Sequence, residues 1–599
     1  MAPHRPDLPP GPIVGIDLGT TNSEIAVYRE GRVDLLGDPI ILPSVVGCDE
    51  SGRFMVGEAA KNQFALFPER TVRSVKRQMG GTQKIHLGDS AFRPEEISAL
   101  ILKELKRRAE AALGVPVRRA VITVPAYFSD AQRQATFAAA ELADLEVMRM
   151  IHEPTAAALA YEVGKEGRRH LLVYDLGGGT FDVSVVTIEQ DVLEVMASTG
   201  DRRLGGDDFD QCLVRHFFEE LKKSYSLDAD ALQGRLAAAL LKTAEATKVH
   251  LSDFPFAVVE EAYIGEDAAG TAMHLRCEVT REEFEQMITP LVDRTMEAVQ
   301  KALLEAELTV LDIEEVVLVG GSTRTPFIQK SLERLFGLVP RGGIHPELCV
   351  ATGAAVQAAV IDGVEVDSVL LDVTPYTFGT NAIDAASGGE KPYNPHFFAP
   401  IIRKNTPIPV TKSEVFCTVN ENQKEVEIKI YQGESDDVRD NLLIGDFTVT
   451  GLSPAPAGNL VTVQLSLTAD GILEVTAQEK VSGLQKSLVI RRSIQAGDGQ
   501  SISAAKERIE RLFAEGEKGS ATVDAAEDGS EESLSEDTAT EVMDLIARAE
   551  SLLPKLTGND ARDVATCLAA VKDAANEGDE AKLDEQSSRL DDLLFYLEM

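Results

Sequence analysis

The chain has 599 residues, with 98 Asp and Glu against 59 Lys and Arg, which gives a formal net charge of −39 at pH 7. That length predicts several domains, and a hydrophobic content of 44% excludes a mostly disordered protein. The charge repels phosphate backbones and anionic lipid, so it argues against nucleic-acid and membrane partners. The six cysteines are widely spaced without a CxxC pair, which is typical of a reducing compartment, and we expect a cytoplasmic protein.

Two segments bear on membrane targeting. Residues 348–361 contain no charged side chain, but the stretch is too short to span a bilayer. Residues 1–11 include Pro and Asp and contain no apolar run, so we expect no signal peptide. Both observations favour a protein that is not inserted in a membrane.

Residues 12–363 alternate strand-like apolar runs with amphipathic stretches. The apolar runs include residues 13–17, 120–124, 171–175 and 316–319. Residues 95–113 and 281–306 have the periodicity of helices that bury one face. This alternation predicts an α/β domain.

The pattern changes after a short segment, residues 364–372, which we interpret as a linker. Across residues 373–494, apolar side chains recur at every second position, for example in residues 461–467. Asp470-Gly471 follows that run and precedes another strand-like run, which is a strong hairpin signal. The segment therefore predicts an antiparallel β domain with one buried face.

The remaining residues, 495–599, are acidic and have helical periodicity. Residues 515–537 hold nine carboxylates and one Lys with few large apolar side chains, which is typical of a mobile connection. Thr538 and Glu541 form a capping box that predicts the start of a helix. Two more amphipathic stretches follow it.

Two segments, residues 14–27 and 172–186, repeat one pattern of strand, Asp, Gly/Thr turn and second strand. The repeat predicts two related halves that face one another. The residues of the two turns are Gly19, Thr20 and Thr21, and Gly177, Gly178, Gly179 and Thr180. A third glycine-rich turn, at residues 320–324, also follows a strand.

The chemistry of these turns suits a chain of phosphates. Glycines let backbone N–H groups approach phosphate oxygens, and Thr hydroxyls add donors. Asp17 and Asp175 occupy matching positions and would hold Mg²⁺ through its waters, because carboxylates repel phosphate directly. Any one turn taken alone is also explained as a plain hairpin, but three together predict a nucleotide site. The pattern is not a Walker loop.

These residues resemble the actin-like ATPase superfamily, and residues 11–494 are more closely similar to the seventy-kilodalton heat-shock chaperones, the DnaK-type family. Further matching segments are VPAYFSDAQRQAT at 124–136, EPTAAALAY at 153–161, LGGDDFD at 204–210 and VLLDVTP at 369–375. The resemblance implies an α/β actin-like two-lobed ATPase domain (12–363), an interdomain linker (364–372), an antiparallel β-sandwich peptide-binding domain (373–494) and a C-terminal α-helical lid with an acidic mobile connection (495–599).

The resemblance also implies ATP and Mg²⁺, with the metal held through water by Asp17 and Asp175. It assigns catalytic roles to Asp17, Lys76, Glu153, Asp175, Thr180 and Asp182. It assigns nucleotide binding to Gly19, Thr20, Thr21, Gly177, Gly178, Gly179, Gly205, Gly206, Glu245, Lys248, Ser252, Gly320, Gly321, Ser322, Arg324 and Glu347. The assignments of Lys76, Glu153, Glu245 and Lys248 depend on the resemblance alone, because lone charged residues are usually solvated side chains.

In the β domain, the resemblance implies a groove for unfolded or extended polypeptides. The matching positions are Phe378, Ile383, Phe416, Val419, Val426 and Ile428. An alternative is that they are simply the buried face of a sheet. Coupling between the domains is assigned to Pro125, Tyr127, Arg133, Val369, Leu370, Leu371 and Asp372. The expected partners are a J-domain co-chaperone and a nucleotide-exchange factor.

The chain departs from the family pattern in several places. These are His152 in place of Asn, Ser368 in place of an aliphatic residue, Glu347 and Leu348 in place of an Asp-Glu pair, a short segment 76–125, and an apparent insertion at 384–398. The departures keep open a specialised paralogue for one client, such as an iron–sulfur assembly scaffold. An actin-like small-molecule kinase or filament protein would leave the β domain unexplained. The sequence thus predicts a chaperone whose groove and lid open with ATP and close on hydrolysis.

Overall fold

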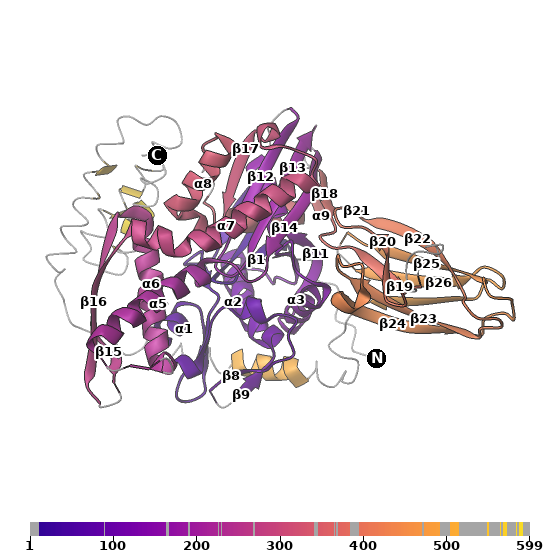
Figure 1. Ribbon diagram of the computed structural model, residues 1–599. Helices are drawn as coiled ribbons and strands as arrows, with labels where there is room; N and C mark the ends of the chain where they lie inside the picture. Colours follow the sequence, from indigo (N-terminus) through magenta and orange to yellow (C-terminus); the bar gives the residue numbers. More distant parts are fainter. Residues whose placement is uncertain are drawn as a thin grey trace. The chain divides into compact units, whose positions relative to one another are not determined.

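The computed structural model describes residues 11–88, 90–162, 167–189, 192–225, 227–228, 231–267, 270–340, 345–364, 366, 369–383, 394–469, 472–490 and 504–513, and scattered residues between 545 and 590 (Figure 1). The chain divides into two units, Met1–Glu517 and Lys518–Met599. None of the described helices is both long and apolar enough to cross a membrane. The uncharged stretch noted in the sequence is instead a buried helix, described below.

The first lobe is built on a mixed sheet. Its strand order is β11 (Glu146–His152), β10 (Arg119–Val124), β1 (Ile13–Leu18), β2 (Asn22–Arg29) and β3 (Arg32–Leu36), with β4 (Leu42–Pro43) paired to β2. Helices α2 (Pro94–Leu113) and α3 (Asp130–Leu142) share one apolar core with this sheet. Smaller elements complete the lobe: β5 (Val46–Cys48), β6 (Phe54–Val56), α1 (Glu58–Gln63), β7 (Thr71–Val72), β8 (Ile85–Leu87) and β9 (Ser90–Phe92).

The second lobe repeats this arrangement. Its sheet has the order β17 (Glu315–Val319), β12 (Arg169–Leu176), β13 (Phe181–Glu189) and β14 (Val192–Asp201), continued by β18 (Val369–Val373) and β21 (Pro407–Ile408). In each lobe, the first strand of the repeat pairs antiparallel with the next strand and parallel with a later one. The predicted internal repeat is therefore also a repeat of topology. The lobe further contains α5 (Gly206–Ser224), α6 (Gly234–Asp253), β15 (Phe256–Glu266), β16 (Ala272–Thr280), α7 (Arg281–Glu305) and α8 (Pro326–Phe336).

Two small-residue helices, α4 (Glu153–Glu162) and α9 (Cys349–Ile361), share one apolar core with strands of both sheets. The helices cross so closely that a Cβ on Gly353 would lie 1.7 Å from the carbonyl oxygen of Ala156. A Cβ on Gly15 of β1 would likewise lie 2.2 Å from the backbone nitrogen of Ala355. Glycine and alanine thus set the separation of the two lobes.

The β domain is a sandwich of two antiparallel sheets. One has the order β20 (Phe397–Ile402), β19 (Phe378–Ala382), β23 (Glu425–Gln432) and β24 (Leu442–Thr450). The other has the order β22 (Val410–Cys417), β25 (Leu460–Leu467), β26 (Leu473–Glu479) and β27 (Gln485–Ile490). Side chains from both sheets form one core, as the period-two pattern predicts. Strands β25 and β26 pair as the expected hairpin, while Asp470-Gly471 lies outside the described residues.

The end of the expected linker is a strand rather than a free connection. Strand β18 pairs in parallel with β14, with Val369, Leu370 and Leu371 opposite Val192, Leu193 and Glu194. Leu370 packs against the core between the lobes, whereas Leu371 is 37% exposed. The alternation of a strand therefore buries one linker leucine and exposes the next. Ser368 lies outside the described residues.

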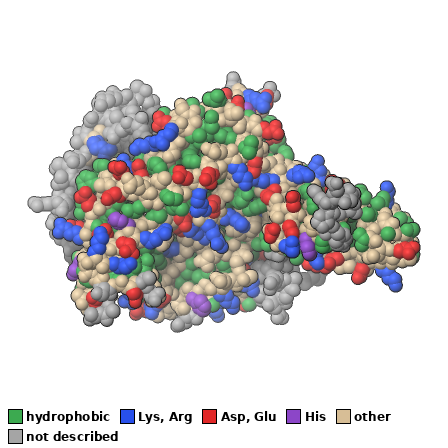
Figure 2. Space-filling view, in the orientation of Figure 1, with side chains coloured by type: hydrophobic (Ala, Val, Ile, Leu, Met, Phe, Trp, Pro, Cys, Tyr) green, Lys and Arg blue, Asp and Glu red, His purple; other side chains and the backbone are tan. Residues whose placement is uncertain are grey.

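Residues 504–513 form a helix that packs on the first lobe. Ile509 is buried in the core of that lobe, and Arg508 and Lys506 form ion pairs with Glu96 and Asp144. The predicted capping box at Thr538 and Glu541, the acidic stretch 515–537 and most of the insertion at 384–398 lie outside the described residues. On the face shown in Figure 2, acidic and basic side chains are interspersed.

We expect Leu370→Asp to release β18 from β14, because a charge would enter an apolar core at a cost of about 2 kcal/mol or more. Leu371→Asp is the matched control, since its side chain is already partly in water. Hydrogen exchange of the amides in residues 192–195 and 369–373 measures the pairing. Equal protection in the two variants would show that Leu370 does not hold the strand in place.

Candidate functional site

The three glycine turns meet at one cavity of about 510 Å³. The turns between β1 and β2, between β12 and β13, and after β17 all contribute to its lining. The residues predicted from the sequence that line it are Asp17, Gly19, Thr20, Thr21, Lys76, Glu153, Asp175, Gly177, Gly178, Thr180, Gly320, Gly321 and Glu347. Asn22, Glu24, Val319, Pro346 and Val350 also line it and were not predicted.

The turns approach one another so closely that side chains would not fit. A Cβ on Gly178 would lie 1.9 Å from Oγ1 of Thr21, and one on Gly205 would lie 2.5 Å from the carbonyl oxygen of Gly178. Gly320 has a φ of 82° and packs against the carbonyl oxygen of Leu176. These glycines leave backbone N–H groups at the cavity wall, where a phosphate would accept hydrogen bonds.

The cavity is rich in buried carboxyl groups. Burial and the nearby charge of Glu153 raise the pKa of Asp17 to about 7 and that of Asp182 to about 8. The same causes raise the pKa of Asp175 well above its usual range. Lys76 forms a buried ion pair with Glu153. Burial opposes the charge of Lys76, but the carboxylates of Glu153 and Asp17 outweigh it and raise its pKa.

This donor set fits a hydrated metal ion. Among the described residues, no group of three or more His, Cys, Asp and Glu side chains is placed to hold a metal directly. Asp17 and Asp175 nevertheless both line the cavity, and Mg²⁺ retains much of its hydration shell. Thr123 donates a hydrogen bond of 2.8 Å to Oδ1 of Asp17 and so fixes the orientation of that carboxylate.

The predicted adenosine walls occupy two places. On α6, Lys248 contacts Asp210 at 2.9 Å, and the hydroxyl of Ser252 donates to the carbonyl oxygen of Lys248 at 3.3 Å. Glu245, the third predicted residue on α6, faces the first lobe. On the other side, the hydroxyl of Ser322 donates to the carbonyl oxygen of Gly177 at 3.0 Å.

Arg324 lies beside His345 and Glu347 on that second wall. Arg324 Nη2 is 2.6 Å from His345 Nε2 and 4.0 Å from a carboxylate oxygen of Glu347. Asn22 donates a 3.0 Å hydrogen bond to the other oxygen of Glu347, and so joins this wall to the turn between β1 and β2.

Two further glycines predicted at the site accept hydrogen bonds from basic side chains. Gly206, at the start of α5, accepts a hydrogen bond from Lys248 through its carbonyl oxygen. Gly179 likewise accepts one from Arg77.

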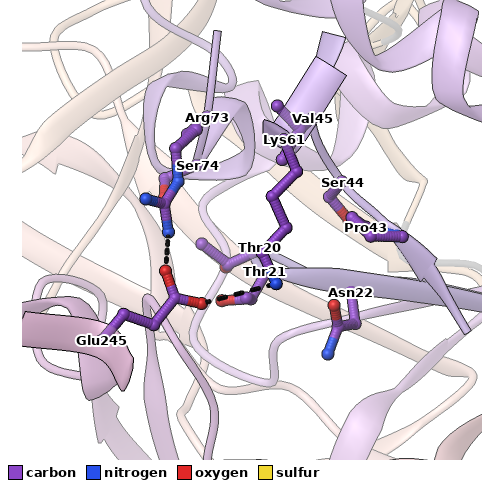
Figure 3. Close-up of a pocket in the computed structure, with 10 residues that line it drawn as sticks. All are labelled: Thr20, Thr21, Asn22, Pro43, Ser44, Val45, Lys61, Arg73, Ser74 and Glu245. Carbon is purple, nitrogen blue, oxygen red and sulfur yellow. Dashed lines mark hydrogen bonds and ion pairs between the residues drawn. The ribbon is translucent and has the colours of Figure 1, made fainter. Parts of the chain in front are cut away.

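Three polar side chains of the first lobe, Arg73, Ser74 and Arg77, contact the second lobe beside the cavity, and we call them the clasp. Arg73 forms an ion pair of 2.5 Å with Glu245, and Lys61 lies 4.0 Å from the same carboxylate (Figure 3). Although burial opposes it, the charges of Arg73 and Lys61 lower the pKa of Glu245. Sequence reasoning selected only Lys76 from this segment. The sequence Arg-Ser-Val-Lys-Arg at residues 73–77 is basic, and this pattern could have indicated Arg73 and Arg77 as well.

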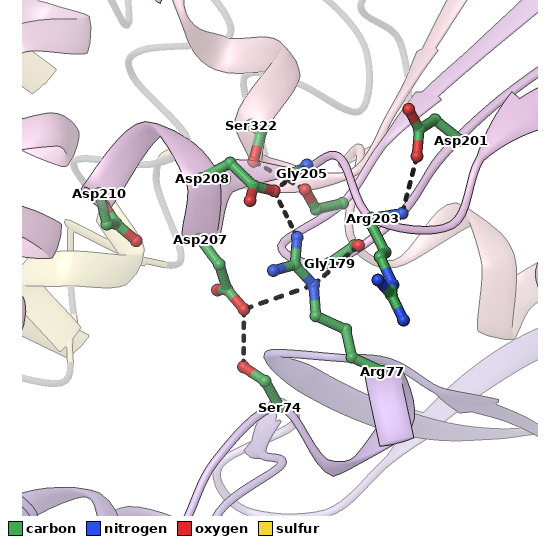
Figure 4. Close-up of polar contacts among 12 residues, drawn as sticks. Ser74, Arg77, Gly179, Asp201, Arg203, Gly205, Asp207, Asp208, Asp210 and Ser322 are labelled. Atoms are coloured by element: carbon green, nitrogen blue, oxygen red, sulfur yellow. Dashed lines mark hydrogen bonds and ion pairs between the residues drawn. The ribbon is translucent and has the colours of Figure 1, made fainter. Parts of the chain in front are cut away.

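The same clasp reaches the start of α5. The Ser74 hydroxyl donates to Asp207 at 2.7 Å, and Arg77 pairs with Asp208 at 2.5 Å (Figure 4). Arg77 also donates to the carbonyl oxygen of Gly179 at 2.9 Å, so it touches the second phosphate turn. One short segment of the first lobe therefore contacts α6, the start of α5 and the glycine turn after β12 in the second lobe.

The residues assigned to coupling form a chain of contacts from the cleft to the β domain. The backbone amides of Ala126 and Tyr127 donate to the carboxylate of Asp182, just after Pro125. The Tyr376 hydroxyl donates to the carbonyl oxygen of Tyr127 at 2.5 Å. The predicted residue Pro125 thus precedes the two amides that contact the cleft.

His152 joins two other coupling residues. Its Nε2 is in contact with the guanidinium of Arg133, and its Nδ1 lies 2.9 Å from the carboxylate of Asp372 at the end of the linker. Arg133 is a donor, so Nε2 accepts and the ring proton is on Nδ1, which donates to Asp372. His152, which departs from the family pattern, therefore connects Arg133 with Asp372.

The groove residues predicted in the β domain differ in their burial. Phe378 and Ile428 are buried in the sandwich core, which is what the alternative interpretation as a buried sheet face also expects. Phe416 and Val426 are partly buried against that core, and Ile383 is half-buried. Val419 is 55% exposed. Period-two patterning does not separate a groove from a core, because both are apolar faces.

Comparisons with known proteins agree with these features. A family model described as "Hsp70 protein" matches residues 13–86 and 81–597. The chain is 45% identical over 489 residues to "Chaperone protein DnaK" of Thermotoga neapolitana and to that of Thermotoga maritima, which is 80% of this chain and 80% of each relative. It is 44% identical over 488 residues to "Chaperone protein DnaK" of Thermosipho africanus, which is 80% of this chain and 79% of that protein.

We expect Arg73→Ala to speed the release of ADP about fivefold, because the ion pair with Glu245 bridges the two lobes and is worth about 1 kcal/mol. Lys61→Ala is the matched control, with a smaller effect, since its ammonium is 4.0 Å from the carboxylate. Displacement of a fluorescent ADP in a stopped-flow instrument measures both rates. An unchanged rate for Arg73→Ala would show that the clasp does not limit release.

We also expect the nucleotide-free chain to lose stability as pH rises from 5 to 8. A carboxyl whose folded pKa is about 8 binds more protons folded than unfolded over this range, so deprotonation favours unfolding. Asp182→Asn removes this contribution, and its urea midpoint should therefore fall less between pH 5 and pH 8. A variant whose midpoint falls as steeply as that of the wild type would contradict the raised pKa of Asp182.

Proposed function

Because the chain belongs to the Hsp70 family, it is an ATP-dependent chaperone with ATPase activity, and we propose that ATP binds in the cavity lined by the three glycine turns. Supporting this proposal, the turns from both halves of the repeat line one cavity with the carboxylates of Asp17 and Asp175. That convergence is the observation that carries the assignment. The kinase and filament alternatives leave the sandwich and strand β18 unexplained.

Within this site, the backbone of the turns would hold the phosphates, and Thr180 would add a hydroxyl donor beside them. Asp17 and Asp175 would hold Mg²⁺ through water, and the ion would neutralise phosphate charge. Lys76, oriented by its ion pair with Glu153, would face the terminal phosphate. Positioning and charge neutralisation account for most phosphoryl-transfer catalysis, so little covalent chemistry is required of the protein.

The remaining roles are part of the same proposal. Glu245, Lys248 and Ser252 on one side, and Arg324 and Glu347 on the other, would form the adenosine walls. Supporting this, Arg324 and Glu347 adjoin the third turn, and Lys248 contacts the carbonyl oxygen of Gly206.

For peptide binding we propose the partly buried side chains Ile383, Phe416 and Val426 together with exposed Val419, where an extended segment would dock. Opening of this groove would follow ATP through the contacts of Tyr127, Tyr376 and Asp372.

Partners and location complete the proposal. A J-domain co-chaperone and a nucleotide-exchange factor are the partners that the family implies, and the contact chain through His152 lies where a partner would influence the linker. We place the protein in the cytoplasm, because Cys212, Cys277, Cys349 and Cys417 are free thiols.

The proposal predicts that an unstructured peptide stimulates steady-state ATP hydrolysis. It also predicts that Thr180→Ala slows single-turnover hydrolysis about tenfold or more while ADP still binds, since its hydroxyl acts on charge that develops in the transition state. Thr187→Ala is the matched control, because Thr187 is buried on β13, the strand that follows Thr180, and does not line the cavity. Equal rates in the two variants would remove Thr180 from the site.

A further inference from the structure

Glu24 is a buried carboxyl group in the cleft that the proposed ATPase mechanism does not use. It lies on β2 directly opposite Asp17 of β1 in the antiparallel register. Its side chain lines the 510 Å³ cavity, yet the residue is only 1% exposed. In such a pair, opposite residues point to the same face of the sheet, so Glu24 and Asp17 present two carboxyl groups side by side.

Glu24 forms no salt bridge with any described residue, and Lys76 is the one cation whose charge offsets part of its own. Its Oε1 atom is buried and has no hydrogen-bond partner. The described lining of the cavity contains five acidic side chains and one basic side chain, Lys76, which is already paired with Glu153. Burial and the charges of Asp17 and Glu347 raise the pKa of Glu24 well above its usual range. A buried carboxylate in this position requires either a cation or a proton.

The surroundings favour a cation with a strong preference for oxygen ligands. The side-chain donors of the cavity lining are carboxylates, threonine hydroxyls, the amide of Asn22 and Lys76, and the lining contains no Cys or His. No described group of three acidic side chains closes around a single point, so an ion here would retain several waters. That coordination is characteristic of Mg²⁺ and Mn²⁺, whereas Ca²⁺ takes six to eight oxygen ligands.

We propose that Glu24, together with Asp17, binds a hydrated divalent cation of the Mg²⁺ class in the nucleotide-free chain. The metal then enters the cleft before the nucleotide instead of arriving only with its phosphates. The proposal adds to the proposed nucleotide site that its metal ion is bound by two carboxyl groups of the protein, those of Glu24 and Asp17. It depends on that site only for the cavity, because the ion binds when no nucleotide is present.

The test is a titration of nucleotide-free, chelator-treated protein with Mn²⁺, in which the EPR signal of free aqueous Mn²⁺ reports binding. A salt concentration near 0.15 M screens weak binding to the acidic surface. The wild type should bind one Mn²⁺ per chain, and Glu24→Gln, which keeps the size of the side chain, should weaken that binding at least tenfold. Glu95→Gln is the matched control, because Glu95 is another buried carboxyl but lies at the start of α2, outside the cavity.

A urea unfolding curve shows whether each variant is folded, and Glu24→Gln should unfold no earlier than the wild type, because it removes a buried, unpaired carboxyl. A wild-type chain that binds no Mn²⁺ in the absence of nucleotide overturns the proposal without any variant, and leaves Glu24 neutralised by a proton. Equal Mn²⁺ affinity in the wild type and Glu24→Gln overturns it as well. Failure of the wild type to bind ADP would instead remove the nucleotide site and leave the Mn²⁺ result standing.

Discussion

The direct contact between the glycine turns of the two lobes is the constraint on which the rest of the structure depends. Gly178 leaves no room for a Cβ beside Thr21, so a glycine from one half of the repeat must meet a threonine from the other. This contact is possible only because the helices between the sheets are also built from small residues, such as Gly353 against Ala156. A larger side chain at either place would separate the lobes and the turns together.

The close approach of the turns also brings several carboxyl groups together. One segment, residues 73–77, supplies basic side chains that form ion pairs with carboxylates in and around the cleft. Residues 73–77 supply Lys76 to Glu153 inside the cleft, and Arg73 and Arg77 to carboxylates of the second lobe at its mouth. The buried pair is held in a dry environment, whereas the outer pairs are partly solvated and therefore easier to break. The same segment thus combines one buried ion pair inside the cleft with two more exposed ion pairs to the second lobe.

The sequence predicted those features that depend on local chemistry. Glycine turns after apolar strands, the repeat of Asp17 and Asp175, and period-two patterning in residues 373–494 each have a short-range physical cause. Lys76 and Glu153 carry no such signal, and only the family resemblance selected them. Arg73 and Glu24 were missed because their significance comes from residues that are far away in sequence or on the opposite strand. Phe378 was ambiguous, since a groove and a core share one pattern.

Asp182 lies at one end of a series of contacts that reaches the β domain. Its carboxylate accepts hydrogen bonds from the amides of Ala126 and Tyr127, and the carbonyl of Tyr127 accepts one from Tyr376 of the β domain. Burial and the charge of Glu153 raise the pKa of Asp182 to about 8, so its protonation, and hence its own charge, is sensitive to charges placed near it. A change in that charge alters the strength with which the two amides are held. The β domain is therefore in contact with residues 126–127 of the first lobe, and strand β18 attaches it to the sheet of the second lobe.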